Sequence, residues 1–163
     1  GGQYTHAAVW FLKALAMLGE ADRAGEVLNM LNPVNHALTS QQASVYKGEP
    51  YVVAGDVYSC GSNAGRSGWT WYTGAAAWMY TVYLEDILGI KIQGGKLSFE
   101  PCLPPGWDKV SVELYHGESL YKIELFNPEG RGTGARSLLL DGKACSEIVL
   151  KDDKNTHYIK VVI

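Results

Sequence analysis

The sequence predicts an α+β chain in which helices come first and an all-β half follows. Apolar residues recur with helical spacing over residues 4–31 and again over residues 75–88. After Gly89, short segments alternate apolar and polar residues with period two, and turn residues separate them. Antiparallel strands of this length and spacing form a sandwich. We place the boundary near residue 92, which gives a helical half at 1–91 and a β half at 92–163.

The first helical segment is predicted to be an αα-hairpin. Gly19 interrupts the pattern, and a second helix restarts after it and ends before Pro33, because proline disfavours helical geometry at the preceding residue. The apolar positions expected on the buried face of the first helix are Ala8, Phe11, Leu12, Leu15 and Leu18.

A long irregular stretch over residues 34–71 separates the hairpin from the next helix. Within it residues 51–58 are apolar enough to be buried, as a helix or a strand, and we favour a helix. A glycine-rich loop follows at 60–68. Loops of this length in compact domains tend to be functional. The next helix is predicted over 75–88, where Gly89 ends it.

The β half is predicted to contain six short strands. Turn sequences such as Pro104-Pro105-Gly106 and Asp141-Gly142 separate several of them. The expected strands are residues 97–99, 110–114, 121–125, 137–140, 147–150 and 157–163.

The bulk composition describes a folded chain and excludes some classes of function. The 163 residues are 47% hydrophobic and 19% charged, which is typical of a globular protein. A net charge of -3 without a basic run gives no reason to expect nucleic acid as a partner. No apolar run is long enough to span a bilayer. Five Trp and ten Tyr against three Phe suit either sugar binding or ordinary packing.

The cysteines and histidines lack the spacing of a metal site, so we expect no metal. Cys60, Cys102 and Cys145 lie far apart. Reduced thiols fit a cytoplasmic protein best, and one disulfide stays open as an alternative. The chain starts at Gly1 without an initiator Met, so we interpret it as a fragment. The histidines expected to be structural or exposed are His36, His116 and His157.

Several strings are more specific than their periodicity. They are GGQYTHAAVW at residues 1–10, MLNPVNH at 30–36, EPYVVAGDVY at 49–58, GWTWYTGAAAWMY at 68–80, ILGI at 87–90 and PCLPPGW at 101–107. They resemble the C-terminal end of family 94 glycoside phosphorylases, formerly family 36 glycosyltransferases. Within that family they are most like the phosphorylase-like domain of cyclic β-1,2-glucan synthases. The resemblance runs over essentially the whole chain.

This resemblance implies a specific architecture and a set of partners. Residues 1–91 would be the last helices of an (α/α)6 barrel, and 92–163 would be a small antiparallel β-sandwich packed on it. The implied partners are a β-glucan oligosaccharide, phosphate and the rest of the same barrel, and a homodimer is compatible with it. The protein would be cytoplasmic, or the cytoplasmic domain of a larger membrane protein.

Members of the family carry out an inverting phosphorolysis. A carboxylic acid protonates the glycosidic oxygen while inorganic phosphate attacks the anomeric carbon from the opposite face, in the place that water takes in an inverting hydrolase. The product from a β-linked glucan is α-glucose 1-phosphate. Phosphate is a co-substrate, and no cofactor is implied.

Three positions match the phosphate cradle of the family: His6, Thr73 and Gly74. For Thr73 and Gly74 the local sequence supports the same role, because Thr73 lies where a helix begins and the N–H of Gly74 can point at an anion. The alternatives are that Thr73 is only an N-cap and that His6 is a hydrogen-bonded structural residue. The resemblance places the catalytic acid upstream of Gly1, so we assign it to no residue here, and we expect the chain alone to be inactive.

Weaker candidates for contacts with the substrate lie in the loop before Thr73. Arg66 can donate to an anion or a sugar, and solvation is its alternative role. Trp69, Trp71 and Tyr72 can form a flat aromatic surface on which a sugar stacks. Packing of the loop is an alternative role of at least equal weight.

Two other functions stay open. A non-catalytic carbohydrate-binding or scaffold module would present aromatic side chains of the β half in an exposed groove. A hydrolase with the same barrel would use water and would not bind an anion at His6 and Thr73. The aromatics that a binding module would use are Trp107, Tyr115, Tyr121 and Tyr158.

Overall fold

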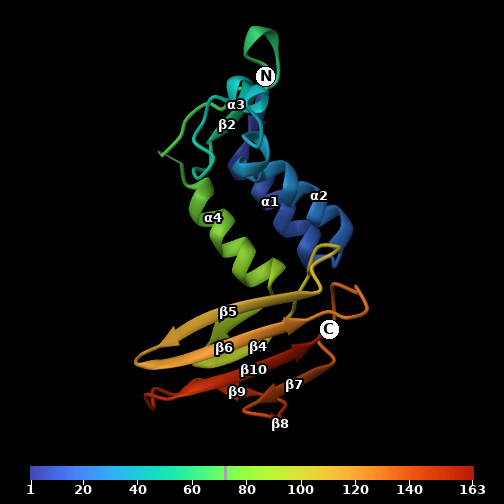
Figure 1. Ribbon diagram of the computed structural model, residues 1–163, viewed down its shortest axis with the longest axis vertical. Helices are drawn as coiled ribbons and strands as arrows, with labels where there is room; N and C mark the ends of the chain where they lie inside the picture. The colour runs from blue at the N-terminus through green and yellow to red at the C-terminus, as the bar shows by residue number, and fades with distance from the viewer. Residues whose placement is uncertain (72) are drawn as a thin grey trace.

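The computed structural model describes residues 1–71 and 73–163, and the helical half precedes the β half as predicted (Figure 1). The helices are α1 (Thr5–Met17), α2 (Ala21–Leu31), α3 (Ser40–Tyr46) and α4 (Ala75–Val82), and α4 continues into a π-helical turn at Tyr83–Ile87. The strands are β1 (Gly2–Tyr4), β2 (Asp56–Tyr58), β3 (Ile90–Gln93), β4 (Lys96–Phe99), β5 (Lys109–His116), β6 (Ser119–Phe126), β7 (Ser137–Leu140), β8 (Lys143–Ala144), β9 (Ile148–Val149) and β10 (Thr156–Val162).

Helices α1 and α2 form the predicted hairpin. Gly19 turns the chain with a φ of +74°, a region that glycine adopts without steric cost. Its N–H donates to the carbonyl of Ala16 and the N–H of Glu20 donates to the carbonyl of Leu15, which is the paired bonding of a Schellman motif. The end of α2 before Pro33 is also confirmed.

The buried face of α1 differs in part from the prediction. Val9, Leu12 and Leu15 are buried against α2 and α4. Phe11 and Leu18, which were expected to be buried, are 57% and 77% exposed. Helix α1 is apolar on two sides, and only one of them is covered within this chain.

The helix favoured over residues 51–58 is wrong, and the alternative of a strand holds for Asp56–Tyr58, which form β2. Strand β2 pairs antiparallel with β1, so that Tyr4 lies opposite Asp56. On its other side the N–H of Gly68 donates to the carbonyl of Asp56, and Val57 bridges to Ser67. These cross-strand hydrogen bonds, which local sequence does not reveal, hold the segment extended. We call the three paired segments, residues 2–4, 56–58 and 66–68, the ribbon.

The stretch predicted to be irregular contains an α-helix that we did not predict, and two short 3-10 helices at Pro33–His36 and Gly61–Asn63. Helix α3 begins after Thr39, whose Oγ1 accepts from the N–H of Gln42 at 3.2 Å. The side chain of Gln42 in turn accepts from the N–H of Thr39 at 3.0 Å. This reciprocal pair is a capping box.

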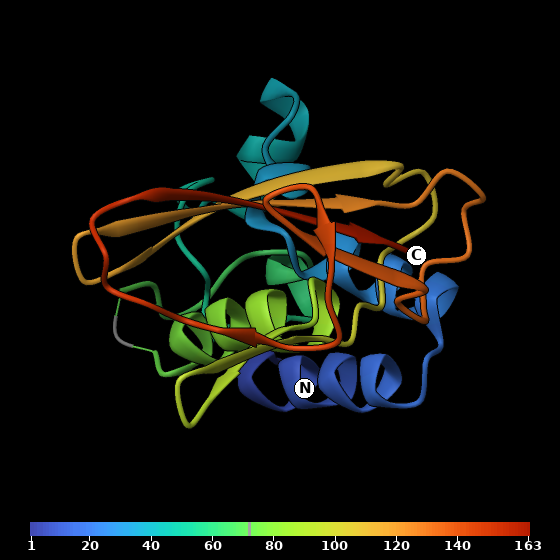
Figure 2. The same ribbon diagram turned by 90° about the horizontal axis from the view of Figure 1, so that it is seen from below.

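The β half consists of two sheets, with strand orders β5-β6-β10-β7-β8 and β3-β4-β9. The sheets face each other as two layers (Figure 2), and one hydrophobic cluster joins Leu97 and Ile148 of the smaller sheet to Ile123 and Val161 of the larger one. Among the described residues every strand pair is antiparallel except β6–β10, which is parallel. The purely antiparallel prediction is wrong for this pair, because β10 arrives from the other sheet and no hairpin fixes its direction.

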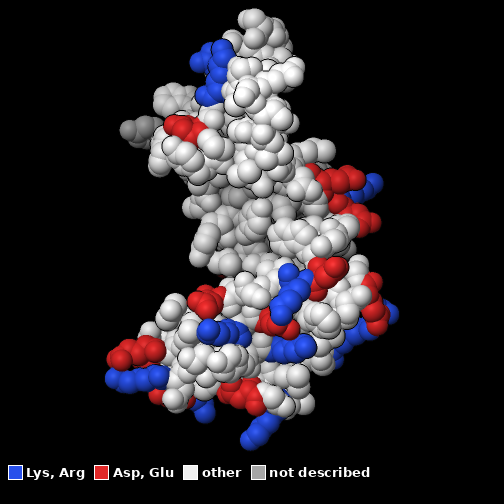
Figure 3. All heavy atoms as spheres, in the orientation of Figure 1, with Lys and Arg blue, Asp and Glu red and all other residues white. Residues whose placement is uncertain are grey.

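The two halves are packed together. A Cβ on Gly25 of α2 would lie only 2.9 Å from Cβ of Pro104, so glycine permits this close approach. Trp107 contacts the hydrophobic clusters of both halves. On the face seen in Figure 3, charged side chains gather over the β half and are sparse over the helical half.

Candidate functional site

Helices α1 and α4 begin beside each other and run in the same direction. The rings of His6 and Trp78 lie 6.0 Å apart, and those of Trp10 and Trp78 lie 5.5 Å apart. Further along, Nζ of Lys13 lies 2.8 Å from Oδ2 of Asp86. The pairs progress together along both helices, so the two helix N-termini lie at the same end of the molecule.

The ribbon holds this end of α1 in place. The N–H of Thr5 donates to the carbonyl of Gly55 at 3.0 Å, just before β2. Gly55 in turn lies against Thr73, because a Cβ on Gly55 would be 3.6 Å from Cβ of Thr73. The start of α1, strand β2 and the start of α4 therefore meet at one place.

His6 occupies this meeting point. Its ring packs edge-on against Trp10, with centroids 5.1 Å apart, and lies 6.1 Å from the ring of Tyr4. Its Nε2 is buried and has no hydrogen-bond partner among the described residues. An unpaired buried nitrogen lowers stability unless a ligand supplies its partner.

Gly74 and Thr73 lie next to His6. A Cβ on Gly74 would be 4.0 Å from Cε1 of His6, so the glycine leaves the space beside the ring free. Oγ1 of Thr73 accepts from the N–H of Ala75 at 3.1 Å. Thr73 therefore does cap α4, and the proton of its hydroxyl group can still be donated elsewhere.

The local electrostatics favour an anion at the ends of the two helices. A helix N-terminus carries partial positive charge, and acidic side chains in the first turn usually offset it. The first turns of α1 and α4 contain no acidic residue. The field of the two N-termini is therefore not neutralised by their own side chains.

A hollow of about 280 Å³ opens beside this end. Asp56 and Trp69 line it together with Thr73 and Gly74, and Tyr4 and Gly55 complete the wall. Its lining thus combines hydrogen-bond donors, one carboxylate and aromatic rings. We call it the ribbon hollow.

The weaker candidates for contacts with the substrate do not all lie in one place. Arg66 lines an adjoining hollow of about 380 Å³ with Tyr58, Asn63 and Trp69, so Trp69 borders both hollows. Trp71 lines neither, and its Nε1 donates to Oε1 of Glu49 at 3.1 Å. Tyr72 lies outside the described residues.

Glu49 has a lowered pKa. The first cause is a hydrogen bond from its own backbone N–H, and the second is the bond from Trp71. The carboxyl is therefore held in its ionised form, which is the opposite of what a general acid needs.

The aromatic residues of the β half do not form one surface. Tyr121 is 1% exposed, and Trp107 packs between the two halves. Tyr115 and Tyr158 are exposed on the outer face of the larger sheet. Two of the four aromatics on which a binding module would depend are therefore used for packing.

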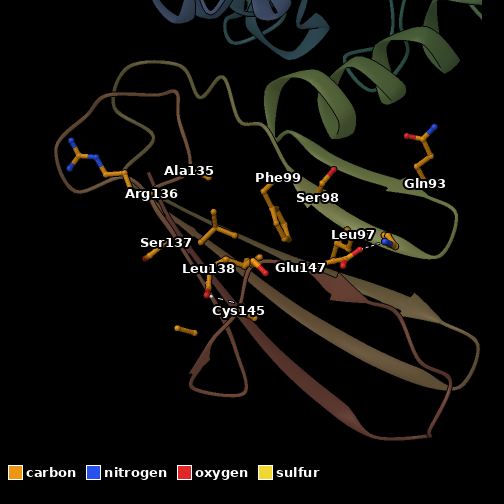
Figure 4. Close-up of a pocket in the computed structure, with 14 residues that line it drawn as sticks. Gln93, Leu97, Ser98, Phe99, Ala135, Arg136, Ser137, Leu138, Cys145 and Glu147 are labelled. Atoms are coloured by element: carbon orange, nitrogen blue, oxygen red, sulfur yellow. Dashed lines mark hydrogen bonds and ion pairs between the residues drawn. The ribbon is translucent and has the colours of Figure 1, made fainter.

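Another hollow, of about 710 Å³, lies between the two sheets and is lined by residues 93–161, far in the sequence from His6 (Figure 4). Leu97, Phe99 and Leu138 form apolar parts of its wall, and Cys145 and Glu147 lie beside them. Glu147 is paired with Lys96. The carboxylate in its wall is thus paired with a cation.

No three His, Cys, Asp or Glu side chains gather to hold a metal in the part of the chain that the structure describes. Within the same residues no helix has the length and apolar character needed to cross a membrane.

Comparison with known protein families decides the family. The model named "Glycosyl hydrolase 94 superfamily, catalytic domain" matches residues 1–89, which is more than half of the chain. The chain belongs to this superfamily. The resemblance to family 94 predicted from the sequence strings is therefore confirmed. Residues 90–130 match a second model, "Glycosyl hydrolase family 65, C-terminal domain".

Several relatives of this family-94 chain are phosphorylases or synthases by name. It is 48% identical to a cyclic beta-(1,2)-glucan synthase of Rhizobium meliloti over 77% of its own length and 4% of that protein. It is 28% identical to an N,N'-diacetylchitobiose phosphorylase of Vibrio furnissii over its whole length and 20% of that protein. It is 26% identical to a 1,2-beta-oligoglucan phosphorylase of Listeria innocua over 70% of its length and 12% of that protein. The chain thus spans at most a fifth of these three relatives.

The sequence interpretation of this family-94 chain missed three residues of the ribbon hollow, Tyr4, Gly55 and Asp56. No role was assigned to Asp56 from the sequence. Its position in the wall became visible once β2 was recognised as a strand opposite Tyr4.

Proposed function

We propose that this chain is the C-terminal part of an inverting β-glucan phosphorylase, in which His6, Thr73 and Gly74 bind inorganic phosphate. Residues 1–91 would be the closing helices of an (α/α)6 barrel, and 92–163 the β-sandwich packed on it. No cofactor is needed, because phosphate itself is the nucleophile. The phosphorylases and the glucan synthase among the relatives support this class of reaction.

The observation that carries the proposal is the buried, unpartnered Nε2 of His6 beside Gly74. A phosphate oxygen would supply the missing hydrogen-bond partner. Thr73 can donate its hydroxyl proton to the same anion, and the two helix N-termini add favourable partial charge. A dianion that is held in this way needs no general base.

The remaining chemistry requires residues from elsewhere in the protein. An inverting mechanism needs an acid on the opposite side of the glycosidic bond from the nucleophile. Asp56 lies in the same hollow as Thr73, so it is on the wrong side for this role. We therefore place the acid outside this chain and expect the chain alone to be catalytically inactive.

The apolar outer faces of α1 and α4 support a further barrel segment as the partner of this chain. Trp10, Phe11 and Met17 are exposed at helical spacing on α1, and Tyr80 is 68% exposed on α4. Contiguous apolar surface of this kind is rarely left open to water. The rest of the barrel would cover it and close the ribbon hollow.

The test is an assay of the complete gene product with a β-1,2-linked gluco-oligosaccharide, with and without phosphate. We expect phosphate-dependent release of α-glucose 1-phosphate, identified by its NMR coupling. Release of free glucose at a rate independent of phosphate would make the protein a hydrolase and overturn the proposal. The purified 163-residue chain serves as the inactive control.

A further inference from the structure

The carboxylate of Asp56 is fixed by the ribbon in an unusual position. Its Oδ1 accepts from the backbone N–H of Trp69 at 3.2 Å. To reach this donor the side chain crosses over Gly68, since a Cβ on Gly68 would lie only 1.8 Å from that oxygen. Glycine at position 68 is therefore needed for Asp56 to point where it does.

The other oxygen of Asp56 is free. Oδ2 has no hydrogen bond or ion pair to any described residue, and Asp56 lines the ribbon hollow. A carboxylate oxygen that faces a hollow can accept hydrogen bonds, and it repels a second anion. This oxygen would repel a phosphate placed directly beside it, and it can accept a hydrogen bond from a hydroxyl group of a neutral ligand.

The lining of the ribbon hollow is divided between these two chemistries. Donors suited to an anion lie at Thr73 and Gly74, on the side of His6. Asp56 and Trp69 lie on the ribbon side, and Trp69 is 70% exposed, so its ring can stack on a sugar. An aromatic face combined with a carboxylate acceptor is the usual way to bind a hexose with its hydroxyl groups.

We infer that Asp56 binds a hydroxyl group of the glucosyl unit that is transferred to phosphate, and that it is a specificity-determining residue of the site. The inference rests on the proposed function and adds a sugar contact to its phosphate contacts. Tyr4 and Trp69 flank Asp56 in the wall of the hollow and would enclose the same sugar. Gly68 is the positioning residue that leaves room for the carboxylate.

The test compares Asp56→Asn with the wild type in the complete gene product. Asparagine has the same shape and can keep the bond from the N–H of Trp69, so the ribbon should stay intact. Hydrogen bonds to charged groups are strong, so we expect the KM for the oligosaccharide to rise about 10- to 100-fold. The KM for phosphate should stay the same or fall, because a negative charge beside the anion is removed.

A second variant tests the positioning. Gly68→Ala keeps the carboxylate but pushes it away from its place, so it should reproduce the rise in oligosaccharide KM. Asp22→Asn, an exposed change in the first turn of α2, is the matched control and should leave both KM values unchanged. Melting temperatures of all variants show whether the fold is retained.

Deoxy analogues of the non-reducing glucosyl unit identify the hydroxyl group. With the analogue that lacks the hydroxyl group bound by Asp56, the wild type and Asp56→Asn should have the same KM. If Asp56→Asn folds and keeps the wild-type KM for the oligosaccharide, the inference is wrong while the proposed function stands. If the wild type itself releases no glucose 1-phosphate, the proposed function fails first.

Discussion

His6, in the first turn of α1, and Gly74, directly before α4, lie side by side although they stand at opposite ends of the helical half of the sequence. The space that a side chain at Gly74 would fill borders Cε1 of His6. Beside it, the buried Nε2 of His6 has no partner among the described residues. This arrangement leaves room beside His6 for the anion that we propose binds there.

Gly74→Ala should weaken phosphate binding without unfolding the protein. The backbone at Gly74 has φ of -72°, which any residue can adopt, and the added Cβ would be 4.0 Å from His6, an ordinary contact. The methyl group would occupy space that we assign to the anion. We expect the KM for phosphate of the complete gene product to rise about tenfold, the cost of about 1.4 kcal/mol of binding. An unchanged KM together with an unchanged melting temperature would rule Gly74 out of the phosphate site.

His6→Phe should separate stability from activity. Phenylalanine keeps a ring against Trp10 and Trp78 and removes the buried nitrogen that lacks a partner. Without phosphate we expect the free energy of unfolding to stay the same or to rise by about 1 kcal/mol. Phosphorolysis should fall about 100-fold, as it does when an essential donor to a developing charge is lost. Urea unfolding and initial rates measure the two effects.

A purely structural role for His6 predicts the opposite pattern. The variant would then lose stability and keep its activity per folded molecule. Added phosphate provides a second readout, because it should raise the melting temperature of the wild type and not of His6→Phe.

The sequence predicts those features of the fold that local chemistry decides. Gly19 and Pro33 mark the hairpin because turn geometry and helix termination depend on single residues. The parallel pairing of β10 with β6 and the strand at Asp56–Tyr58 depend on partners that are distant in the sequence. Periodicity contains no information on such partners, so it could neither predict the parallel pair nor decide between helix and strand at residues 51–58.

The candidate site shows the same limit. The resemblance of the sequence strings indicates His6, Thr73 and Gly74, but the contact between α1 and α4 requires the folded chain. Asp56 could not be assigned to a sugar, because its direction depends on the absent side chain of Gly68. His157 was expected to be structural or exposed. The sequence does not show that it binds two carboxylates, because Asp141 is 16 residues away and Asp153, four residues away, forms no recognisable motif with it.

His157 should make the stability of the β half depend on pH. Its Nδ1 lies 2.9 Å from Oδ2 of Asp141 and its Nε2 lies 3.1 Å from Oδ1 of Asp153, while its ring stacks on Tyr121. The hydrogen bond to Asp141 is the first cause that raises the pKa of His157 above 6.5. The pKa of Asp153 is lowered to about 2, first by the backbone N–H of Asn155, and that of Asp141 is lowered first by His157.

The direction of the pH dependence follows from these shifts. The raised pKa of His157 contributes stability that is fully present below about pH 6.5 and is lost as the pH rises through the folded-state value. The lowered pKa values of the aspartates contribute stability that is present above about pH 3.8 and is lost as the pH falls through their folded-state pKa values, which is about 2 for Asp153. We expect the highest melting temperature between these limits. His157→Gln should flatten the alkaline side of the profile, and an unchanged profile would contradict this role.

Lys13 and Asp86 should stabilise the helical half as a pair. Asp86 lies in the π-helical turn after α4 and is 7% exposed, and Nζ of Lys13 on α1 binds it at 2.8 Å. Lys13→Met removes the cation and leaves a buried carboxylate without its partner, which should lower the free energy of unfolding by about 2 kcal/mol. The double variant Lys13→Met/Asp86→Leu removes both charges and should recover most of that loss, because apolar side chains can replace a buried pair. Urea unfolding of the four proteins of this cycle measures the coupling. Equal losses in Lys13→Met and in the double variant would mean that the carboxylate of Asp86 left without its partner is not the cause of the loss.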